Sequence, residues 1–87
     1  MSKPLMILYF AWLRERTGRS HEELALPSGV TTVAELVDCL AARDPAHASA
    51  FQNRRTIRCA INQEFADPSS PLQPGDEVAF FPPVTGG

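Results

Sequence analysis

Two segments that are apolar on both faces, one near each end of the chain, most constrain what this sequence can fold into. Residues 5–12 read Leu-Met-Ile-Leu-Tyr-Phe-Ala-Trp, and residues 77–81 read Glu-Val-Ala-Phe-Phe. A strand with one wet face alternates apolar and polar side chains, whereas a continuous apolar run is typical of a strand covered on both faces. We therefore expect both segments to be inner strands of one mixed sheet, in which parallel pairing of the two is one possible arrangement.

One amphipathic helix is predicted between these strands. Thr32 and Glu35 fit a capping box, and the apolar residues behind them recur at helical spacing as Val33, Leu36, Val37 and Leu40. The helix should end near Asp44, because Pro45 disfavours helical geometry in the residue before it. Asp44 can also cap a second short helix that runs through Phe51, with Pro45 at its first position.

The remaining segments complete a small α+β fold. Residues 13–18 indicate a helical turn, residues 21–26 a second strand, and residues 56–62 a strand with one buried face, followed by a short return at Phe65. Pro74-Gly75 suits a type II turn before the last strand. The expected architecture is a mixed four- to five-stranded sheet with one main helix packed on one face.

A single helix leaves the other face of such a sheet open. Because neighbouring residues in a strand point to opposite faces, at least one of Phe80 and Phe81 should lie on the open face. An aromatic side chain exposed there indicates a partner interface, so both residues are candidates for it.

The chain continues beyond the last strand as Pro82-Pro83-Val84-Thr85-Gly86-Gly87. The prolines supply no backbone N–H, so the sheet ladder should end near Phe81 and the next residues should be extended. Gly86 and Gly87 have no Cβ atoms, which lets the backbone enter a narrow slot and present a terminal carboxylate at its far end. A frayed terminus is the alternative, but two terminal glycines arise by chance in only about one chain in two hundred.

A carboxylate of this kind needs activation before it can react as an acyl group. Its reference pKa of about 3.5 keeps it ionised at neutral pH, where it is a poor electrophile. Acyl-adenylate formation would activate it, yet the chain has no G-x-x-x-x-G-K-[ST] loop to hold ATP phosphates. The tail is therefore expected to be the substrate of another protein.

Composition excludes several other classes. The chain has 87 residues and a net charge of -2 with dispersed basic residues, so we expect one small domain and no nucleic-acid partner. The apolar run at residues 5–12 is too short to span a bilayer, and we expect no membrane partner and a cytoplasmic location. Cys39 and Cys59 lack metal-ligand spacing and are interpreted as small apolar residues, so no metal site and no bound cofactor are expected.

Two groups of polar residues do not indicate a specific catalytic function. His21 stands beside two glutamates without a catalytic partner and is interpreted as a solvated edge residue. Arg54, Arg55 and Arg58 form the most basic stretch, which is either a solvated face or a docking patch for an acidic partner surface. No catalytic triad or carboxylate pair can be assembled, which argues against an enzyme acting alone.

Residues 72–87, Leu-Gln-Pro-Gly-Asp-Glu-Val-Ala-Phe-Phe-Pro-Pro-Val-Thr-Gly-Gly, resemble the C-terminal signature of the small subunits of molybdopterin synthase. The resemblance continues through residues 8–11, 32–40 and 60–62 and so covers most of the chain. It implies a ubiquitin-like β-grasp domain in residues 1–81 and an extended tail in residues 82–87.

The resemblance also implies a sulfur carrier. Gly87 would be adenylated by an E1-like adenylating enzyme, converted to a thiocarboxylate by a sulfur-donating enzyme, and delivered into the large synthase subunit. There it would donate sulfur to cyclic pyranopterin monophosphate, with the catalytic side chains on the large subunit and with two small subunits on a large-subunit dimer. The residues that pass into the partner would be Pro82, Pro83, Val84, Thr85 and Gly86.

Three alternatives share parts of this pattern. A thiamine-pathway sulfur carrier and a ubiquitin-like protein modifier also end in Gly-Gly, and the segment Phe81-Pro82-Pro83-Val84-Thr85 favours the molybdopterin synthase type over both. A β-grasp interaction module whose tail does no chemistry is a different class. Such a module should work equally well with a few residues added beyond Gly87.

Overall fold

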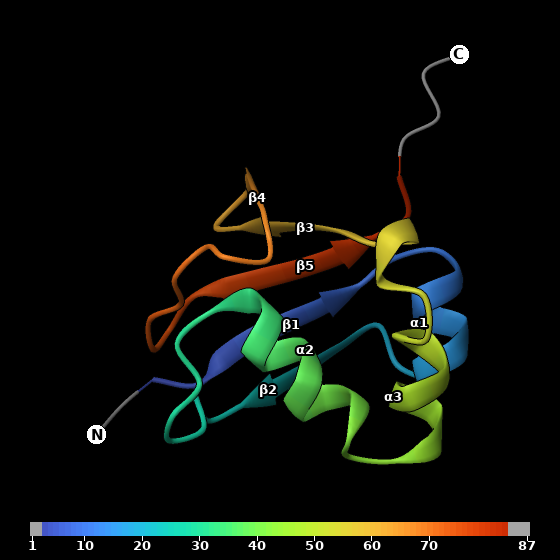
Figure 1. The fold of residues 1–87 in the computed structure, drawn as a ribbon, viewed down its shortest axis with the longest axis horizontal. Helices are drawn as coiled ribbons and strands as arrows, with labels where there is room; N and C mark the ends of the chain where they lie inside the picture. Colours follow the sequence, from blue (N-terminus) through green and yellow to red (C-terminus); the bar gives the residue numbers. More distant parts are fainter. Residues whose placement is uncertain (1–2, 84–87) are drawn as a thin grey trace.

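The computed structural model of this chain describes residues 3–83, which form a mixed sheet with helices on one side (Figure 1). The expected roles of residues 84–87 lie outside the described residues. In chain order the elements are β1 (Leu5–Tyr9), α1 (Trp12–Thr17), β2 (His21–Leu24), α2 (Val33–Ala41), α3 (Pro45–Ala50), the 3-10 helix η1 (Arg54–Thr56), β3 (Arg58–Ile61), β4 (Glu64–Ala66) and β5 (Glu77–Phe81).

The sheet has five strands in the order β2-β1-β5-β3-β4, which confirms the expected α+β fold. The two segments that are apolar on both faces pair in parallel, with Ile7 opposite Val78 and Tyr9 opposite Phe80. The other three pairings are antiparallel. β1 and β5 are inner strands, as their apolar runs predict, because each is flanked by a neighbour on both sides.

The first strand is shorter than predicted. β1 ends at Tyr9, and Trp12 belongs to α1 instead. The chain turns at Ala11, whose φ of 56° is incompatible with a continuing strand. Gly18, with a φ of 78°, closes α1 in the left-handed conformation that glycine adopts without steric cost. Two other strands are trimmed: β2 ends at Leu24, and η1 replaces the start of the strand predicted at residue 56.

The capping predictions for the helices are confirmed. The Thr32 hydroxyl accepts a hydrogen bond from the Glu35 N–H at 3.3 Å, and the Glu35 carboxylate accepts one from the Thr32 N–H at 3.1 Å. α2 stops a little before the predicted end near Asp44, since the Arg43 N–H bonds to the Leu40 carbonyl and tightens the last turn. Asp44 caps α3 by accepting from the His47 N–H at 2.8 Å.

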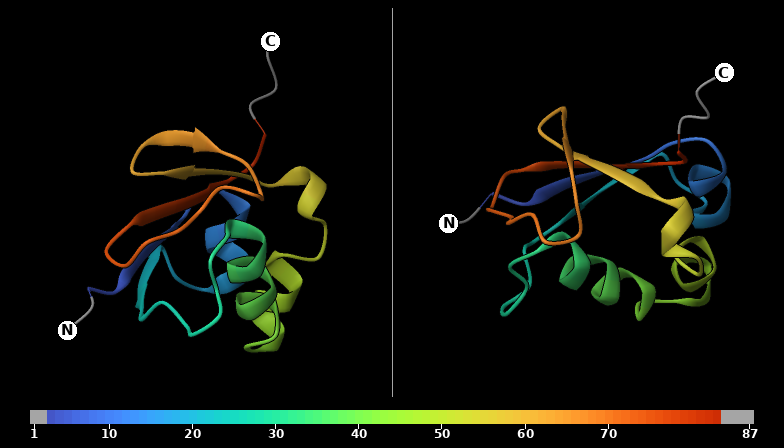
Figure 2. Two further views of the ribbon diagram at one scale, coloured as in Figure 1. Left: turned by 60° about the vertical axis from the view of Figure 1, so that its left-hand side comes forward. Right: turned by 45° about the horizontal axis from the view of Figure 1, so that its top comes forward.

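The core lies between the sheet and the helices, which share one side of it (Figure 2). The apolar stripe of α2 is buried there, together with an aromatic cluster from β1, α3 and β5. In that cluster the ring of Phe80 lies 5.1 Å from Phe51 and 6.2 Å from Tyr9, centroid to centroid. Among the helices of the described residues, none has the length and apolar character that a membrane crossing requires.

Candidate functional site

The tail begins at the end of an inner strand. β5 ends at Phe81, and Pro82 and Pro83 follow it as half-buried residues outside the ladder. The Phe80 carbonyl accepts a hydrogen bond from the Phe10 N–H at 3.1 Å, which ties this end of β5 to the segment leading into α1. The ladder thus stops where the prolines predict. Val84, Thr85, Gly86 and Gly87 lie outside the described residues, and their roles stay predictions.

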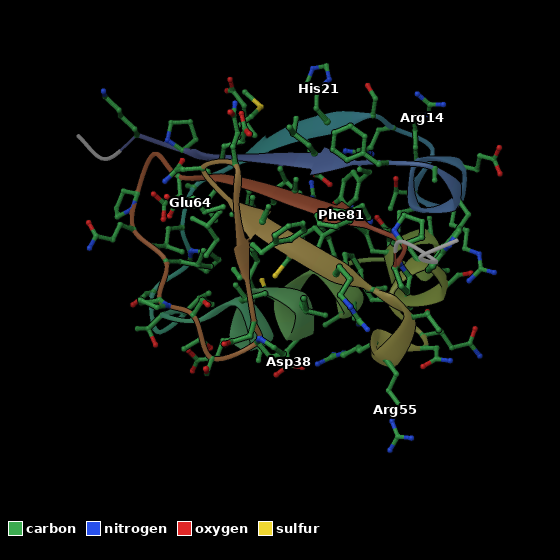
Figure 3. All side chains as sticks on the ribbon, turned by 90° about the horizontal axis from the view of Figure 1, so that it is seen from above. Arg14, His21, Asp38, Arg55, Glu64 and Phe81 are labelled. Carbon is green, nitrogen blue, oxygen red and sulfur yellow. The ribbon has the colours of Figure 1, made fainter. Side chains whose placement is uncertain are left out.

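The two phenylalanines before the tail have different surroundings. Phe80 is 1% exposed and packs in the core, so it offers no surface to a partner. Its assignment to the interface is corrected: Val78 and Phe80 share the face that the helices cover. Phe81 points to the opposite face, where it is half-buried, and its role at an interface stays a prediction (Figure 3).

That opposite face carries an apolar surface that no helix of the described part covers. Register places six side chains on it, and we call this set the open face: Met6, Leu8, Ala60, Phe65, Ala79 and Phe81. The Phe65 and Phe81 rings lie 6.0 Å apart, centroid to centroid, and Phe65 is 85% exposed. Met6, Leu8, Ala60 and Phe81 are half-buried, and Ala79 is buried beneath them. An apolar surface that carries an exposed aromatic side chain is a candidate interaction site.

Polar residues border the open face. His21 and Glu23 lie on the same face of the edge strand β2, and Arg58 lies opposite Phe81 on β3. All three are exposed, which confirms His21 as a solvated edge residue. An apolar centre with a polar border is the usual anatomy of a protein interface. Sequence reasoning missed Phe65 as part of this surface, although an aromatic residue in a short return strand was the available signal.

A buried polar cluster lies elsewhere, between β2 and α3. One carboxylate oxygen of Glu22 accepts from the Tyr9 hydroxyl at 2.7 Å and faces His47 Nε2 at 2.8 Å. Its other oxygen is bonded by Arg43, and by Arg19 at 3.3 Å. The second ring nitrogen of His47 faces the Asp44 carboxylate at 2.8 Å. His47 is fully buried, and its two ring nitrogens bridge the carboxylates of Glu22 and Asp44.

The surroundings shift the pKa values in this cluster in opposite directions. Burial raises the pKa of Glu22, but hydrogen bonds from His47, Tyr9 and Arg43 lower it by more than burial raises it. The pKa of Glu22 therefore lies below its ordinary value. The pKa of Tyr9 is raised, mainly by burial and then by the bond to Glu22. Since these groups satisfy one another, the cluster anchors α3 to the sheet and has no free group to react. The sequence did not predict it.

The cysteines show no metal chemistry in the described residues. Cys59 is buried, as a small apolar residue would be, and burial raises the pKa of its thiol. Cys39 is partly exposed on α2. Within residues 3–83, no group of three or more His, Cys, Asp or Glu side chains could hold a metal ion. The candidate site is therefore the tail together with the open face at its base.

Comparison with known proteins gives a family. The model of the ThiS family matches residues 7–87. The molybdopterin synthase sulfur carrier subunit of Escherichia coli K12 is 40% identical over 83 residues, which cover 95% of this chain and 99% of that protein.

Solved structures agree with the fold. A structure from Pyrococcus furiosus, described as molybdopterin converting factor, subunit 1, has a TM-score of 0.77 at 28% identity and covers 95% of this chain and 100% of its own. SAMP1 of Haloferax volcanii has a TM-score of 0.73 at 30% identity, with coverage of 97% and 99%.

Proposed function

This chain belongs to the ThiS family, and from that premise we propose how it works as the sulfur carrier subunit of a molybdopterin synthase. Its function is that of a sulfur carrier in molybdenum cofactor biosynthesis. The observation that carries the proposal is the extent of the family match, which runs to residue 87 and so includes Gly86 and Gly87. The reacting group is then the carboxyl group of Gly87.

The proposed chemistry has three steps. An E1-like adenylating enzyme lets the Gly87 carboxylate attack the α-phosphorus of ATP, which forms the acyl adenylate and releases pyrophosphate. A sulfur-donating enzyme supplies the sulfur that displaces AMP and leaves a thiocarboxylate. The thiocarboxylate sulfur then attacks cyclic pyranopterin monophosphate in the large subunit and forms a thioester to the carrier. Water cleaves the acyl carbon–sulfur bond of this thioester, so the sulfur stays on the pterin and the carrier returns with a carboxylate.

The described residues support separate roles for the domain, which would bind the partner, and for the tail, which would enter it. β5 is held between β1 and β3, so the segment that starts at Pro82 is anchored to the most constrained part of the sheet. The open face, with Phe81 next to the tail, is the surface we propose for the large subunit. A partner docked there would receive the tail directly, and it would also provide the catalytic side chains. We place this cycle in the cytoplasm, where ATP is available.

Intact-mass measurement tests the proposal most directly. Protein isolated from its own host, or incubated with the activating enzyme, ATP and a sulfur source, should contain a fraction heavier by the mass difference between sulfur and oxygen. A variant that lacks Gly87 is the matched control and should gain no such mass. If the full-length protein never gains it with every partner present, the tail does not carry sulfur in this way.

A protein modifier is the second candidate, because this chain is 30% identical to SAMP1 and 28% identical to a structure named small archaeal modifier protein 1. A modifier would use the same activated Gly87 but transfer it to a lysine of another protein. Denaturing gels of host extract, probed with an antibody against the chain, separate the two functions. Ladders of higher-mass conjugates that disappear when Gly87 is removed would favour the modifier.

A further inference from the structure

A cavity of about 520 Å³ lies on the helix side of the sheet, away from the open face. α2 forms one wall through Val33 and Val37, while Cys59 and Ala66 line it from β3 and β4. At one end the loop after β4 is fastened to α2, because the Ala34 N–H bonds to the Pro68 carbonyl at 2.9 Å. At the other end stands η1. Its volume falls within the range of small-molecule pockets, about 300–1,000 Å³, and is therefore large enough to take up a side chain.

Three arginines stand at the η1 end of this apolar cavity. Arg54, Arg55 and Arg58 all contribute to its lining, and all three are exposed. Arg54 pairs with Asp38 at 2.5 Å, but both side chains are solvated, and such pairs are weak. In the described part of the chain, no salt bridge involves Arg55 or Arg58. The cavity thus combines apolar walls with a basic border at its η1 end. The acidic residue of its lining, Asp67, stands beside Pro68 at the other end, where its carboxylate accepts hydrogen bonds from Ser69 and Ser70.

The placement of the arginines argues for an elongated occupant. Figure 3 shows Arg55 projecting away from the body of the protein. Arg58 lies on the open-face side of β3, and its guanidinium is held over η1 by a 3.1 Å hydrogen bond to the Arg55 carbonyl. The charges are therefore spread along the border and do not converge on one point. Carboxylates flanking an apolar side chain would match this spacing better than a single small anion.

We infer that this cavity, which we call the α2–η1 pocket, binds an acidic peptide segment of a partner protein and takes up one of its apolar side chains. Charge complementarity would set the orientation of the segment, and apolar burial would supply the anchor. The pocket and the open face lie on opposite sides of the sheet, but Arg58 borders both of them, so a partner at the pocket and a partner on the open face would meet at this residue. The inference does not depend on whether Gly87 carries sulfur.

The test is a ¹⁵N-labelled NMR titration of the full-length chain with two probe peptides. One is acetyl-Asp-Glu-Leu-Phe-Glu-Asp-amide, and the control replaces its four acids with lysines. The acidic peptide should give saturable shifts at the amides of Val37, Ile57 and Ala66, and none at Met6 or Leu8 on the open face. The lysine peptide should give no saturable shift.

Two variants locate the binding further. Arg55→Gln removes one exposed charge and should weaken the acidic peptide about 1.4- to five-fold, the range for a solvated ion pair. Ala34→Met should fill the cavity and abolish binding, with an unchanged circular dichroism spectrum as the control for folding. The inference is overturned if the acidic peptide shows no saturation at millimolar concentration, shifts the open face, or binds no better than the lysine peptide. It is also overturned if phosphate alone reproduces the same shifts, because the site would then recognise a small anion.

Discussion

Replacing Glu22 with glutamine should destabilise this protein far more than the same replacement at its exposed neighbour Glu23. The change preserves the shape of the side chain and removes its charge. Glu22 is 7% exposed, and its oxygens serve Tyr9 and His47 on one side and two arginines on the other. The amide of a glutamine can keep its oxygen toward Tyr9 and His47, but its NH₂ group then faces the guanidinium groups and cannot accept from them.

The expected cost follows from these contacts. Hydrogen bonds to a charged partner contribute about 1.5–3 kcal/mol each. The guanidinium groups of Arg43 and Arg19 are 39% and 45% exposed and can turn toward water, so their loss costs less than that. The buried contact with His47 is also weakened, which adds to the cost in the free energy of unfolding. We expect a loss of about 2 kcal/mol in the free energy of unfolding, which lowers Tm by about 8–16 °C in a chain of this size.

Thermal melts followed by circular dichroism provide the assay, and Glu23→Gln is the matched control. Glu23 is the next residue in β2, points to the opposite face and is exposed, so its loss should change stability by less than about 0.5 kcal/mol. The pH dependence gives a second readout. Because folding lowers the pKa of Glu22, its stabilisation is present above the unfolded carboxyl pKa and is lost as the pH falls through the lower folded value.

The wild-type and Glu22→Gln curves should therefore begin to converge as the pH falls below the ordinary glutamate pKa of about 4.3, and they should meet only below the lower folded pKa of Glu22. The reasoning fails if Glu22→Gln melts with Glu23→Gln at neutral pH. It also fails if the gap between wild type and Glu22→Gln stays constant on acidification, because the stabilisation would then not come from the charge of Glu22.

Two predictions concern the candidate site. Phe81→Ala should weaken the complex with the large subunit at least about five-fold, the loss typical of a central interface residue, and unchanged affinity in a folded variant would exclude the open face. Gly86→Ala should change the free energy of unfolding by less than about 0.5 kcal/mol, and so leave Tm nearly unchanged. It should nevertheless slow the reconstituted synthase roughly five- to 150-fold, because an added methyl group would overpack a fitted tunnel. Thr85→Ala is measured beside it, and wild-type turnover by Gly86→Ala with partners limiting would show that this glycine provides flexibility.

The features that depend on residues close in the sequence could be predicted from the sequence. The capping box at Thr32 and Glu35 and the capping of α3 by Asp44 could be predicted because each is a contact across three residues. The inner position of β1 and β5 was predictable for a different reason: both segments are apolar on both faces, and only inner strands bury such segments. That the two strands pair in parallel with each other was decided by the tertiary structure.

Features that join distant segments were not accessible in this way. The Glu22–His47 contact links residues 25 positions apart, and nothing in the local sequence of either residue indicates it. The choice between Phe80 and Phe81 also needed the tertiary structure. Alternation along a strand shows that the two residues face opposite sides, but the helices decide which side is buried, and they are placed by packing over the whole core.

The sequence by itself determined that this chain is a small α+β domain followed by a tail that ends in two glycines, because strand periodicity, helix capping and the missing Cβ atoms of glycine are properties of short segments. The tertiary structure decided that Phe81 joins Phe65 on an open face, that His47 is held between two carboxylates, and that three arginines border an apolar cavity. Each of these depends on how β4, α3 and η1 pack against the sheet, and packing is set by all the segments together.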